Sequence, residues 1–358
     1  MNGLLREDIG YVGGINIPWE KLQNKSILIS GGTGLIGSFL VDVLMQKNQD
    51  GLNCKIYVVG RNVDKGKTRF EEFWNSEYFE FVSHDMNQQL EMDEDIVVDY
   101  VLHLASNTHP VAYSTDPIGT VTTNIIGTNN LLKFAVKHHA TRFAFASSNE
   151  VYGENRGDVE FFDENYCGYI NSNTLRAGYS ESKRCGEALC QAYMRQEGLD
   201  VVIPRLTRSY GPTMLMSDTK AISQFIKKGI AGKDIVLKSS GTQYYSYTYV
   251  ADAVAGLLTV LLRGENGEAY NIADEAGDIM LKDLAAVIAD YAGTKIIFEF
   301  PEEVERVGYS TVTKARLCGS KLKKLGWSMK YDIKSGIERT MDTLKERYMN
   351  EDLDGWIH

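Results

Sequence analysis

The chain has 358 residues, of which 43% are hydrophobic, and this is enough to bury the core of one large α/β domain or of two unequal lobes. Its formal net charge is −10, and no run of lysine or arginine rises above this acidic background, which argues against a nucleic-acid partner. No apolar stretch approaches the length of a membrane span, no secretory signal is visible, and the five cysteines show no metal-binding spacing, so we expect a soluble, cytoplasmic protein with free thiols and no metal.

Strands and helices alternate along most of the chain. A short apolar strand at 26–30 precedes a helical stretch at 35–46. Further strands are expected at 55–59, 80–82, 100–104, 142–146 and 201–204, with long helices at 117–137 and 179–197. This alternation predicts an α/β fold with a Rossmann-type, doubly wound parallel sheet that helices cover on both faces.

The regular alternation loosens after Gly211-Pro212, which predicts a smaller C-terminal α/β lobe for the substrate. The first residues form a lead-in that we expect to pack on the Rossmann domain through Pro18, Trp19 and Leu22. The predicted lead-in is 1–24, and the Rossmann domain is 25–210 with parts of 241–262. The predicted substrate lobe is 211–240 with 263–346, and a tail follows at 347–358.

A glycine-rich turn joins the first strand to the first helix. Gly31, Gly34 and Gly37 recur at a spacing of three residues. Glycine lets the backbone approach a pyrophosphate closely, and the unpaired N–H groups of the following helix then bind it. The turn predicts a dinucleotide site built by Gly31, Thr33, Gly34, Leu35, Ile36 and Gly37.

The end of the second strand bears on the choice of cofactor. An acidic residue there usually binds the adenosine ribose, whereas this strand ends in Val59-Gly60-Arg61-Asn62. Arg61 stands where a 2′-phosphate would lie, which favours NADP over NAD; stacking of Arg61 on the adenine is the alternative. Asp85, which closes the third strand, is placed to accept a hydrogen bond from the adenine amino group, and we also assign Asn62 and Met86 to the cofactor site.

Tyr179 and Lys183 open the helix 179–197 and, being four residues apart, share one of its faces. An ammonium beside a phenol, together with a cationic nicotinamide, lowers the pKa of the phenol toward neutrality. The phenolate then accepts a proton from a substrate hydroxyl while hydride leaves the same carbon, and Ser148 hydrogen-bonds that oxygen. These three residues are the candidate catalytic group, and Tyr179 and Lys183 also belong to the cofactor site.

The order of these motifs resembles that of the extended short-chain dehydrogenase/reductases, a family of nucleotide-sugar epimerases, dehydratases and decarboxylases. The resemblance runs from about residue 25 to 330 and includes His103-Leu104-Ala105-Ser106, Asn124-x-x-Gly127-Thr128, Tyr210-Gly211-Pro212, Tyr249-Val250-x-Asp252 and Ser320-Lys321 with Leu325-Gly326-Trp327. It implies a tightly bound NAD(P), a nucleotide-sugar substrate, and cofactor contacts at Leu104, Ala105, Ser106 and Asn124. It also implies a homodimer in which the helices at about 118–137 and 179–197 of two copies form a four-helix bundle.

The segment Ser148-Asn149-Glu150 separates the branches of this family. By resemblance, 4,6-dehydratases carry Thr-Asp-Glu there, and the Asn149 amide cannot serve as their general acid. Simple 4-epimerases usually lack the glutamate, whereas UDP-glucuronate decarboxylases carry Thr-Ser-Glu. The decarboxylase branch is therefore favoured, with epimerisation or dehydration as the alternatives, and Glu150 is expected to guide protonation at C5.

In the implied reaction, Tyr179 deprotonates the C4 hydroxyl of the sugar and hydride passes to the nicotinamide. The resulting 4-ketone makes the C5 carboxylate a β-keto acid that loses carbon dioxide, and the cofactor returns hydride to C4. The resemblance implies further substrate contacts at His109, Tyr113, Asn149, Arg176 and Gln224.

Two arginines of the family pattern are missing. The family's Gln-x-Arg, whose arginine clamps the diphosphate, reads Gln243-Tyr244-Tyr245 here, and its Gly-Pro-Arg-Met carries Thr213 in place of the arginine. Arg208, in turn, occupies the family's usual asparagine position after the sixth strand. We hypothesise that Arg208 supplies the missing phosphate contact beside Tyr245, and we place Arg306 near the family's second phosphate arginine.

A function of another class remains open, because a fold does not fix a function: a non-catalytic, NAD(P)-binding sensor. The intact Ser148, Tyr179 and Lys183 favour an enzyme instead. The tyrosines of 244–249 alternate along an expected strand, either as packing or as a wall of the substrate site.

Overall fold

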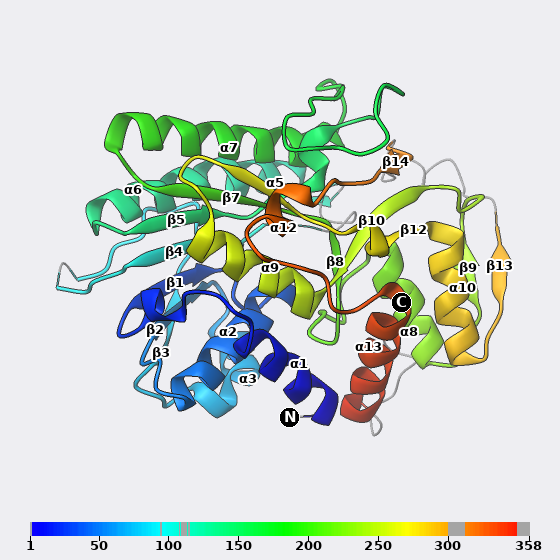
Figure 1. The fold of residues 1–358 in the computed structure, drawn as a ribbon, viewed down its shortest axis with the longest axis horizontal. Coiled ribbons are helices and arrows are strands. Elements are labelled where there is room, and N and C mark those ends of the chain that lie inside the picture. Colours follow the sequence, from blue (N-terminus) through cyan, green and yellow to red (C-terminus); the bar gives the residue numbers. More distant parts are fainter. Residues whose placement is uncertain are drawn as a thin grey trace.

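The computed structural model describes residues 2–93, 95–106, 108, 113, 115–299 and 312–348. Figure 1 shows a sheet with helices above and below it, and beside it a smaller part in which α8, α10 and α13 lie against short strands. The amino-terminal helix and the carboxyl-terminal helix approach each other at the lower edge of this view.

The main sheet has eight strands in the order β11-β7-β5-β4-β1-β2-β3, with β6 paired to β7. They are β1 (Ser26–Ser30), β2 (Lys55–Gly60), β3 (Phe79–Ser83), β4 (Tyr100–His103), β5 (Arg142–Phe145), β6 (Ser147–Ser148), β7 (Val201–Leu206) and β11 (Ala269–Ile272). Every recorded pairing among them is parallel. The strands read as apolar runs because both faces are covered; all residues of β1 are buried.

Helices cover the two faces of this sheet and create two apolar cores. They are α1 (Gly3–Gly13), α2 (Leu35–Gln49), α3 (Val63–Arg69), α5 (Pro117–Thr122), the π-helical turn η3 (Thr123–Gly127), α6 (Thr128–Lys137), α7 (Ala177–Glu197) and α9 (Val250–Arg263). One core includes Leu40 and Val254 from α2 and α9, and the other includes Leu131 and Cys190 from α6 and α7. The predicted doubly wound α/β fold is thus confirmed (Figure 1).

The smaller part is built on a second sheet of four strands, in which β8 and β14 pair parallel to β10 and β12 pairs antiparallel to it. Its elements are β8 (Arg208–Tyr210), α8 (Ala221–Ile230), β9 (Ile235–Leu237), β10 (Tyr244–Tyr249), β12 (Asp278–Met280), α10 (Leu281–Ala292), β13 (Ile296–Phe298), β14 (Lys314–Ala315), α12 (Ser320–Lys323) and α13 (Ile333–Tyr348). Short 3₁₀ turns lie at η1 (Trp19–Leu22), η2 (Glu71–Phe73), η4 (Asn149–Tyr152) and η5 (Glu275–Gly277).

Two features differ from the sequence-based divisions. Strand β11 joins the edge of the main sheet beside β7, although residues 263–346 were assigned to the substrate lobe. The apolar helix α9 explains this, because it packs on α2 and β7 and returns the chain to the main sheet. The lead-in also contains a helix, α1, whose buried Asp8 accepts hydrogen bonds from Tyr249 (2.5 Å) and Arg339 (2.9 Å) and so ties the N-terminus to the second part.

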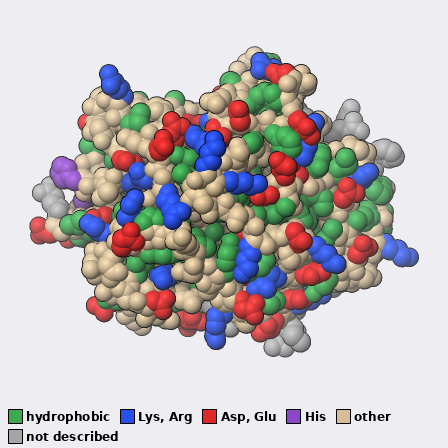
Figure 2. All heavy atoms as spheres, viewed as in Figure 1, with side chains coloured by type: hydrophobic (Ala, Val, Ile, Leu, Met, Phe, Trp, Pro, Cys, Tyr) green, Lys and Arg blue, Asp and Glu red, His purple; other side chains and the backbone are tan. Residues whose placement is uncertain are grey.

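The surface carries no large single-sign field on the face seen in Figure 2, where basic and acidic side chains are interspersed and apolar atoms lie between them in small groups. No helix in the described part of the chain has the length and apolar character needed to cross a membrane.

Candidate active site

The glycine turn lies at the carboxyl end of β1, beside the point where the strand order of the main sheet reverses between β1 and β4. Gly31 has a φ of 73°, and a Cβ on it would lie 2.7 Å from the Ala105 backbone nitrogen. A Cβ on Gly37 would lie 2.5 Å from the Gly31 carbonyl oxygen. Only glycine therefore fits at these two positions.

The N-terminus of α2 is open for an anion. Its N-cap is Gly34, which offers no side-chain hydrogen bond to the first N–H groups of the helix. Unpaired N–H groups at a helix N-terminus attract a pyrophosphate, so the turn fits the predicted dinucleotide. Thr213, from the loop after β8, donates a hydrogen bond to the Leu35 carbonyl oxygen (2.8 Å) and joins the second part of the molecule to this turn.

A hollow of about 370 Å³ opens farther along the same edge of the sheet and is lined by Arg61, Ser83, His84 and Asp85. These residues follow β2 and β3, where the sequence places the adenosine half of the cofactor. The Asn62 side chain instead accepts a hydrogen bond from Lys65 N (2.8 Å) and caps α3, which gives Asn62 a structural role besides the predicted one. Met86 is buried and lies 3.2 Å from where a Gly127 Cβ would be.

Tyr179 lies in the first turn of α7, and its hydroxyl hydrogen-bonds to Ser148 and Ser106. The Ser148 hydroxyl also caps η4 by accepting from Glu150 N (3.2 Å). Burial, reinforced by the charge of Glu150, raises the pKa of Tyr179 to about 12, whereas the serine hydrogen bonds and Arg176 oppose the rise. In the protein alone the phenol is therefore protonated at neutral pH.

A chain of hydrogen bonds fixes these groups from behind. Ser106 donates to Oδ1 of the Asn124 side chain (2.7 Å), the Asn124 amide nitrogen donates to Ser182 (2.8 Å), and Ser182 donates to the Tyr179 backbone carbonyl (2.8 Å). Asn124 lies in the π-helical turn η3, which interrupts the long helix predicted at 117–137. Such turns are frequent at functional sites, because the extra residue re-aims a side chain.

Lys183 lies one turn after Tyr179 and donates to the Ala146 carbonyl oxygen at 2.9 Å. Its ammonium also lies over the rings of Phe145, at 4.8 Å, and of Tyr179, at 6.0 Å from the ring centroid. Burial lowers the pKa of Lys183 to about 8, and the charge of Glu187 opposes this fall. The structure thus brings Ser148, Tyr179 and Lys183 together as predicted from their spacing.

Glu150 is the centre of a charged cluster beside Tyr179. Its carboxylate lies 2.9 Å from Arg176 Nη2 and 3.8 Å from Arg208 Nη2, and it accepts a hydrogen bond from the Ser180 hydroxyl (3.3 Å). The buried Nη1 atoms of Arg176 and Arg208 have no hydrogen-bond partner among the described residues. Ser180, the neighbour of Tyr179, is a contact that the sequence did not reveal, because serine is common at helix starts.

Three aromatic rings line this cluster. The Arg176 guanidinium carbon lies 4.7 Å from the centroid of the Tyr113 ring, which is itself 5.1 Å from the ring of Tyr179. The Arg208 guanidinium carbon lies 3.5 Å from the centroid of the Tyr245 ring. The Tyr245 hydroxyl donates to the Val312 carbonyl oxygen (2.5 Å), which fixes the ring under Arg208.

The Tyr245 ring thus packs against Arg208, which is one of the two roles that the sequence left open for the tyrosines of β10; its role as a wall of the substrate site stays a prediction. Asn149 is buried in η4 between Ser148 and Glu150. His109 and Arg306, the remaining predicted substrate contacts, lie outside the described residues.

Side chains of α8 fix the loop between β8 and α8 by hydrogen bonds to its carbonyl oxygens. Gln224 donates to the Asp218 carbonyl oxygen (3.0 Å), and the buried Lys227 donates to the carbonyl oxygens of Met216 (3.0 Å) and Asp218 (3.1 Å). Sequence reasoning named Gln224 but missed Lys227, whose burial is visible only once α8 is packed. Gln224 therefore positions the loop in this structure, and its predicted contact with a nucleotide stays a prediction.

The comparisons with known proteins agree with this geometry. Residues 27–273 match the model of the NAD dependent epimerase/dehydratase family. The chain belongs to this family. Membership confirms the resemblance, the enzyme class and the nicotinamide dinucleotide cofactor that the motifs predicted, whereas the preference for NADP stays a prediction.

Within the NAD dependent epimerase/dehydratase family, the similar proteins include UDP-glucuronic acid decarboxylases. The chain is 32% identical over 318 residues to UDP-glucuronic acid decarboxylase 5 of Arabidopsis thaliana, and the match covers 88% of each chain. It is 33% identical over 323 residues to UDP-glucuronic acid decarboxylase 1 of Xenopus tropicalis, with 89% of this chain and 72% of that one covered.

Solved structures of the family share the fold. A UDP-glucuronic acid 4-epimerase from Bacillus cereus, in complex with UDP-glucuronic acid and NAD, superimposes with a TM-score of 0.76 at 22% identity, over 90% of this chain and 100% of that one. A dTDP-glucose 4,6-dehydratase from Bacillus anthracis, in complex with NAD, gives a TM-score of 0.74 at 22% identity, over 91% and 98% of the two chains. At these identities the likeness concerns the fold alone.

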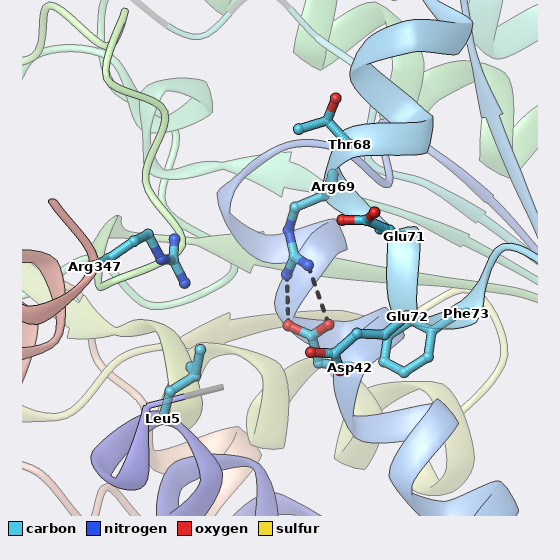
Figure 3. A pocket seen from close by; sticks show the side chains of 8 residues that line it. All are labelled: Leu5, Asp42, Thr68, Arg69, Glu71, Glu72, Phe73 and Arg347. Atoms are coloured by element: carbon cyan, nitrogen blue, oxygen red, sulfur yellow. Dashed lines mark hydrogen bonds and ion pairs between the residues drawn. The ribbon is translucent and has the colours of Figure 1, made fainter. Parts of the chain in front are cut away.

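A second cavity, of about 170 Å³, lies among α2, α3 and α13, away from Tyr179 (Figure 3). Arg69 faces Asp42 there through two hydrogen bonds of 3.2 and 2.5 Å, and Arg347 extends toward them from α13. None of the lining residues is a predicted site residue. We assign the cavity no function, because its ion pair joins α3 to α2 and has a structural role.

Proposed function

We propose that this member of the family is a UDP-glucuronic acid decarboxylase that oxidises the sugar transiently at C4. The observation that carries the proposal is Glu150 held beside Tyr179 by two arginines, on the same edge of the sheet as the dinucleotide turn. The similar proteins named UDP-glucuronic acid decarboxylases support the same reaction.

Tyr179 and Ser148 provide the acid–base chemistry at C4. The cofactor, when bound, accepts hydride from C4 and returns it. Tyr179 accepts the proton of the C4 hydroxyl, and Ser148 and Ser106 hold its oxygen in place before and after the transfer. Because burial raises the pKa of Tyr179 to about 12, ionisation at neutral pH requires positive charge nearby. Arg176 supplies part of that charge, and the Lys183 ammonium lies 6.0 Å from the centroid of the Tyr179 ring.

Glu150 acts on the next carbon of the sugar. Once C4 is a ketone, the bond from C5 to its carboxylate breaks with loss of carbon dioxide, and the electron pair moves onto the C4 oxygen. That oxygen then faces Tyr179 and Ser148, which donate hydrogen bonds to it. A proton must next reach C5, and the carboxyl group of Glu150, two residues after Ser148 in η4, guides it.

NADP is the cofactor that we propose, in preference to NAD. Arg61 is exposed at the end of β2 and lines the hollow that follows β2 and β3. A guanidinium at this place offers a 2′-phosphate charge-assisted hydrogen bonds, whereas a carboxylate would repel it.

A cytoplasmic homodimer is the state in which we propose that the enzyme acts. Large apolar side chains are exposed on α5, on η3 and just before α7: Ile118 is 78% exposed, Ile126 42% and Leu175 61%. Covering them with the same face of a second copy would remove this apolar surface from water. Light scattering should show a dimer for the wild type and a monomer for the double variant Ile118→Glu/Ile126→Glu.

The decisive experiment incubates the enzyme and NAD(P) with UDP-glucuronic acid and weighs the product by mass spectrometry. We expect a nucleotide sugar lighter by one carbon dioxide, with no net consumption of the cofactor. A product lighter by one water would indicate dehydration, and an isomer of unchanged mass would indicate epimerisation. Either result would contradict the proposal. The absence of any product from enzyme that has bound the cofactor would contradict it too.

A further inference from the structure

We propose that Arg176 and Arg208 form a subsite for the carboxylate of the substrate sugar, and that Arg208 is the residue that makes this chain select an acidic sugar. The proposal rests on the proposed function, since it places the C4 hydroxyl at Tyr179. It departs from the phosphate role expected for Arg208 from the sequence, because the structure places its guanidinium at Glu150.

Among the described residues, the positive charges of this cluster outnumber its negative charges. Two guanidinium groups, with side-chain exposures of 18% and 20%, face a single carboxylate, that of Glu150. Each guanidinium also keeps one buried Nη1 without a hydrogen-bond partner among the described residues. Buried donors without acceptors are costly, and these two belong to guanidinium groups that meet at the same Glu150 carboxylate oxygen, so together they are suited to bind an anion with two acceptor oxygens.

The position of the cluster decides which anion is missing. Ser180, the residue after Tyr179, hydrogen-bonds to Glu150, and the Tyr113 ring lies between Arg176 and the ring of Tyr179. A sugar whose C4 hydroxyl meets Tyr179 therefore has its C3 or C5 substituent next to the arginines. The diphosphate is attached at C1, on the opposite side of the pyranose ring. Of the anionic groups of a nucleotide sugar, only a carboxylate at C5 lies so close to C4.

Arg208 and Tyr245 form a unit that is specific to this chain. Arg208 begins β8, which pairs with β10 so that Arg208 lies opposite Tyr247, and its guanidinium stacks on the Tyr245 ring at 3.5 Å. The family pattern described above has an asparagine in place of Arg208 and an arginine in place of Tyr245. Relative to this pattern, the arginine is on β8 and no longer on β10. The Tyr245 ring packs on one face of the Arg208 guanidinium, and the N–H groups at the edge of the guanidinium stay available to a ligand.

This arrangement also favours release of the product. Planar guanidinium groups match the two oxygens of a carboxylate, which carries the charge that the cluster lacks. Loss of carbon dioxide removes that charge from C5 and leaves a neutral sugar. We therefore expect the subsite to bind the acidic substrate more tightly than the neutral product.

Equilibrium binding to the cofactor-loaded enzyme tests the subsite without turnover. The probes are UDP-glucuronic acid, UDP-glucose and UDP-xylose, and binding is followed by calorimetry. If UDP-glucuronic acid turns over during the titration, Tyr179→Phe serves as the background for every variant. We expect the parent enzyme to prefer UDP-glucuronic acid. Arg208→Met should lower the affinity for UDP-glucuronic acid by about 10- to 100-fold, as for a lost charge-assisted hydrogen bond. Its affinities for the two UDP-sugars with neutral sugar rings should change less than about twofold.

Two further variants control the result. Arg195→Met removes a charge from an exposed position of α7 and should leave all three affinities unchanged. The double variant Arg208→Asn/Tyr245→Arg restores the family pattern, whose arginine clamps the diphosphate, and should bind all three ligands with similar affinity, without regaining the preference for UDP-glucuronic acid. Circular dichroism establishes that Arg208→Met is folded.

Equal weakening of all three ligands by Arg208→Met would mean that Arg208 binds the diphosphate, and it would overturn the proposal, as would a parent enzyme without preference for the acidic sugar. The reaction catalysed is a separate question. If the enzyme prefers UDP-glucuronic acid and Arg208→Met removes that preference, the carboxylate subsite stands. If the product is then an isomer of the substrate, the proposed decarboxylation is wrong.

Discussion

Two partly buried arginines three residues apart, Arg205 and Arg208, are used in opposite ways. Arg205, on β7, donates from Nε and Nη2 to Glu187 (2.9 and 2.7 Å) and from Nη1 to the Tyr152 hydroxyl (2.9 Å) and the Glu164 carbonyl oxygen (2.8 Å). Every nitrogen of its guanidinium has a partner. Arg208, on β8, stacks on one ring, lies 3.8 Å from one carboxylate and keeps a buried nitrogen unpartnered among the described residues.

The difference between the two arginines separates structure from function. A guanidinium whose donors are all satisfied within the protein stabilises the fold and has nothing left to offer a ligand. A guanidinium with free, buried donors carries a cost that only a ligand removes. Active sites contain groups of the second kind, because they are complementary to something that the chain itself does not supply.

The largest effect that this comparison predicts is on stability. Arg205→Met removes the ion-pair partner of the Glu187 carboxylate, which is itself partly buried. We therefore expect a loss of about 3–5 kcal/mol in the free energy of unfolding. Arg208→Met relieves an excess of positive charge, and its free energy of unfolding should be unchanged or slightly higher. Urea unfolding of both variants, followed by circular dichroism, measures the difference. Equal losses for the two variants would contradict the distinction.

The next largest effect is on turnover. Tyr179→Phe removes the hydroxyl beside the open cluster and leaves the Arg205 cluster intact, so we expect the rate to fall by about 10²- to 10⁴-fold with little change in unfolding free energy. Product formation from UDP-glucuronic acid at saturating concentration measures the rate. The matched control is Tyr193→Phe, which removes a half-buried hydroxyl near the other end of the same helix, where it donates to Asn129 (2.9 Å), and this variant should keep the parental rate. Retention of more than about a tenth of the activity by Tyr179→Phe would show that another group takes the proton.

The sequence allowed the cofactor half of the site to be predicted closely, and the substrate half less so. Gly31 and Gly37 are recognisable because backbone sterics permit no other residue there, and such a requirement leaves a mark in the sequence itself. Tyr179 and Lys183 are recognisable because both lie on one helix, where spacing fixes geometry.

Contacts between distant segments leave no such mark. The sequence indicated that Arg208 compensates for Tyr245, but not that the guanidinium would lie flat on the ring and turn its edge to Glu150. That detail depends on the pairing of β8 with β10, a non-local contact. Residues 269–272 were assigned to the substrate lobe for the same reason, since the sequence of β11 says nothing about which sheet edge it joins.

A smaller effect concerns pH. Burial lowers the pKa of Lys183 to about 8, so its ammonium is present below that pH and is lost as the pH rises through it. The dinucleotide is an anion, and we expect its affinity for the free enzyme to fall about tenfold or less above pH 8. Fluorescence titration with the reduced cofactor across this range should show the step in the wild type and not in Lys183→Met. Lys227→Met, which removes another buried lysine, should retain it.

The smallest effect concerns the choice between NADP and NAD, and it asks whether an exposed arginine can act as a ligand group, as we propose for the partly buried Arg208. Because Arg61 is exposed to water, its pairing with a 2′-phosphate is partly screened, and Arg61→Ser should weaken the binding of NADP by only about three- to fivefold, while the affinity for NAD changes less than about twofold. Lys67→Met, on the exposed side of the neighbouring helix α3, is the matched control and should alter neither affinity. Equal weakening of both cofactors by Arg61→Ser would mean that the guanidinium stacks on the adenine, which the two cofactors share, and that the preference for NADP is wrong.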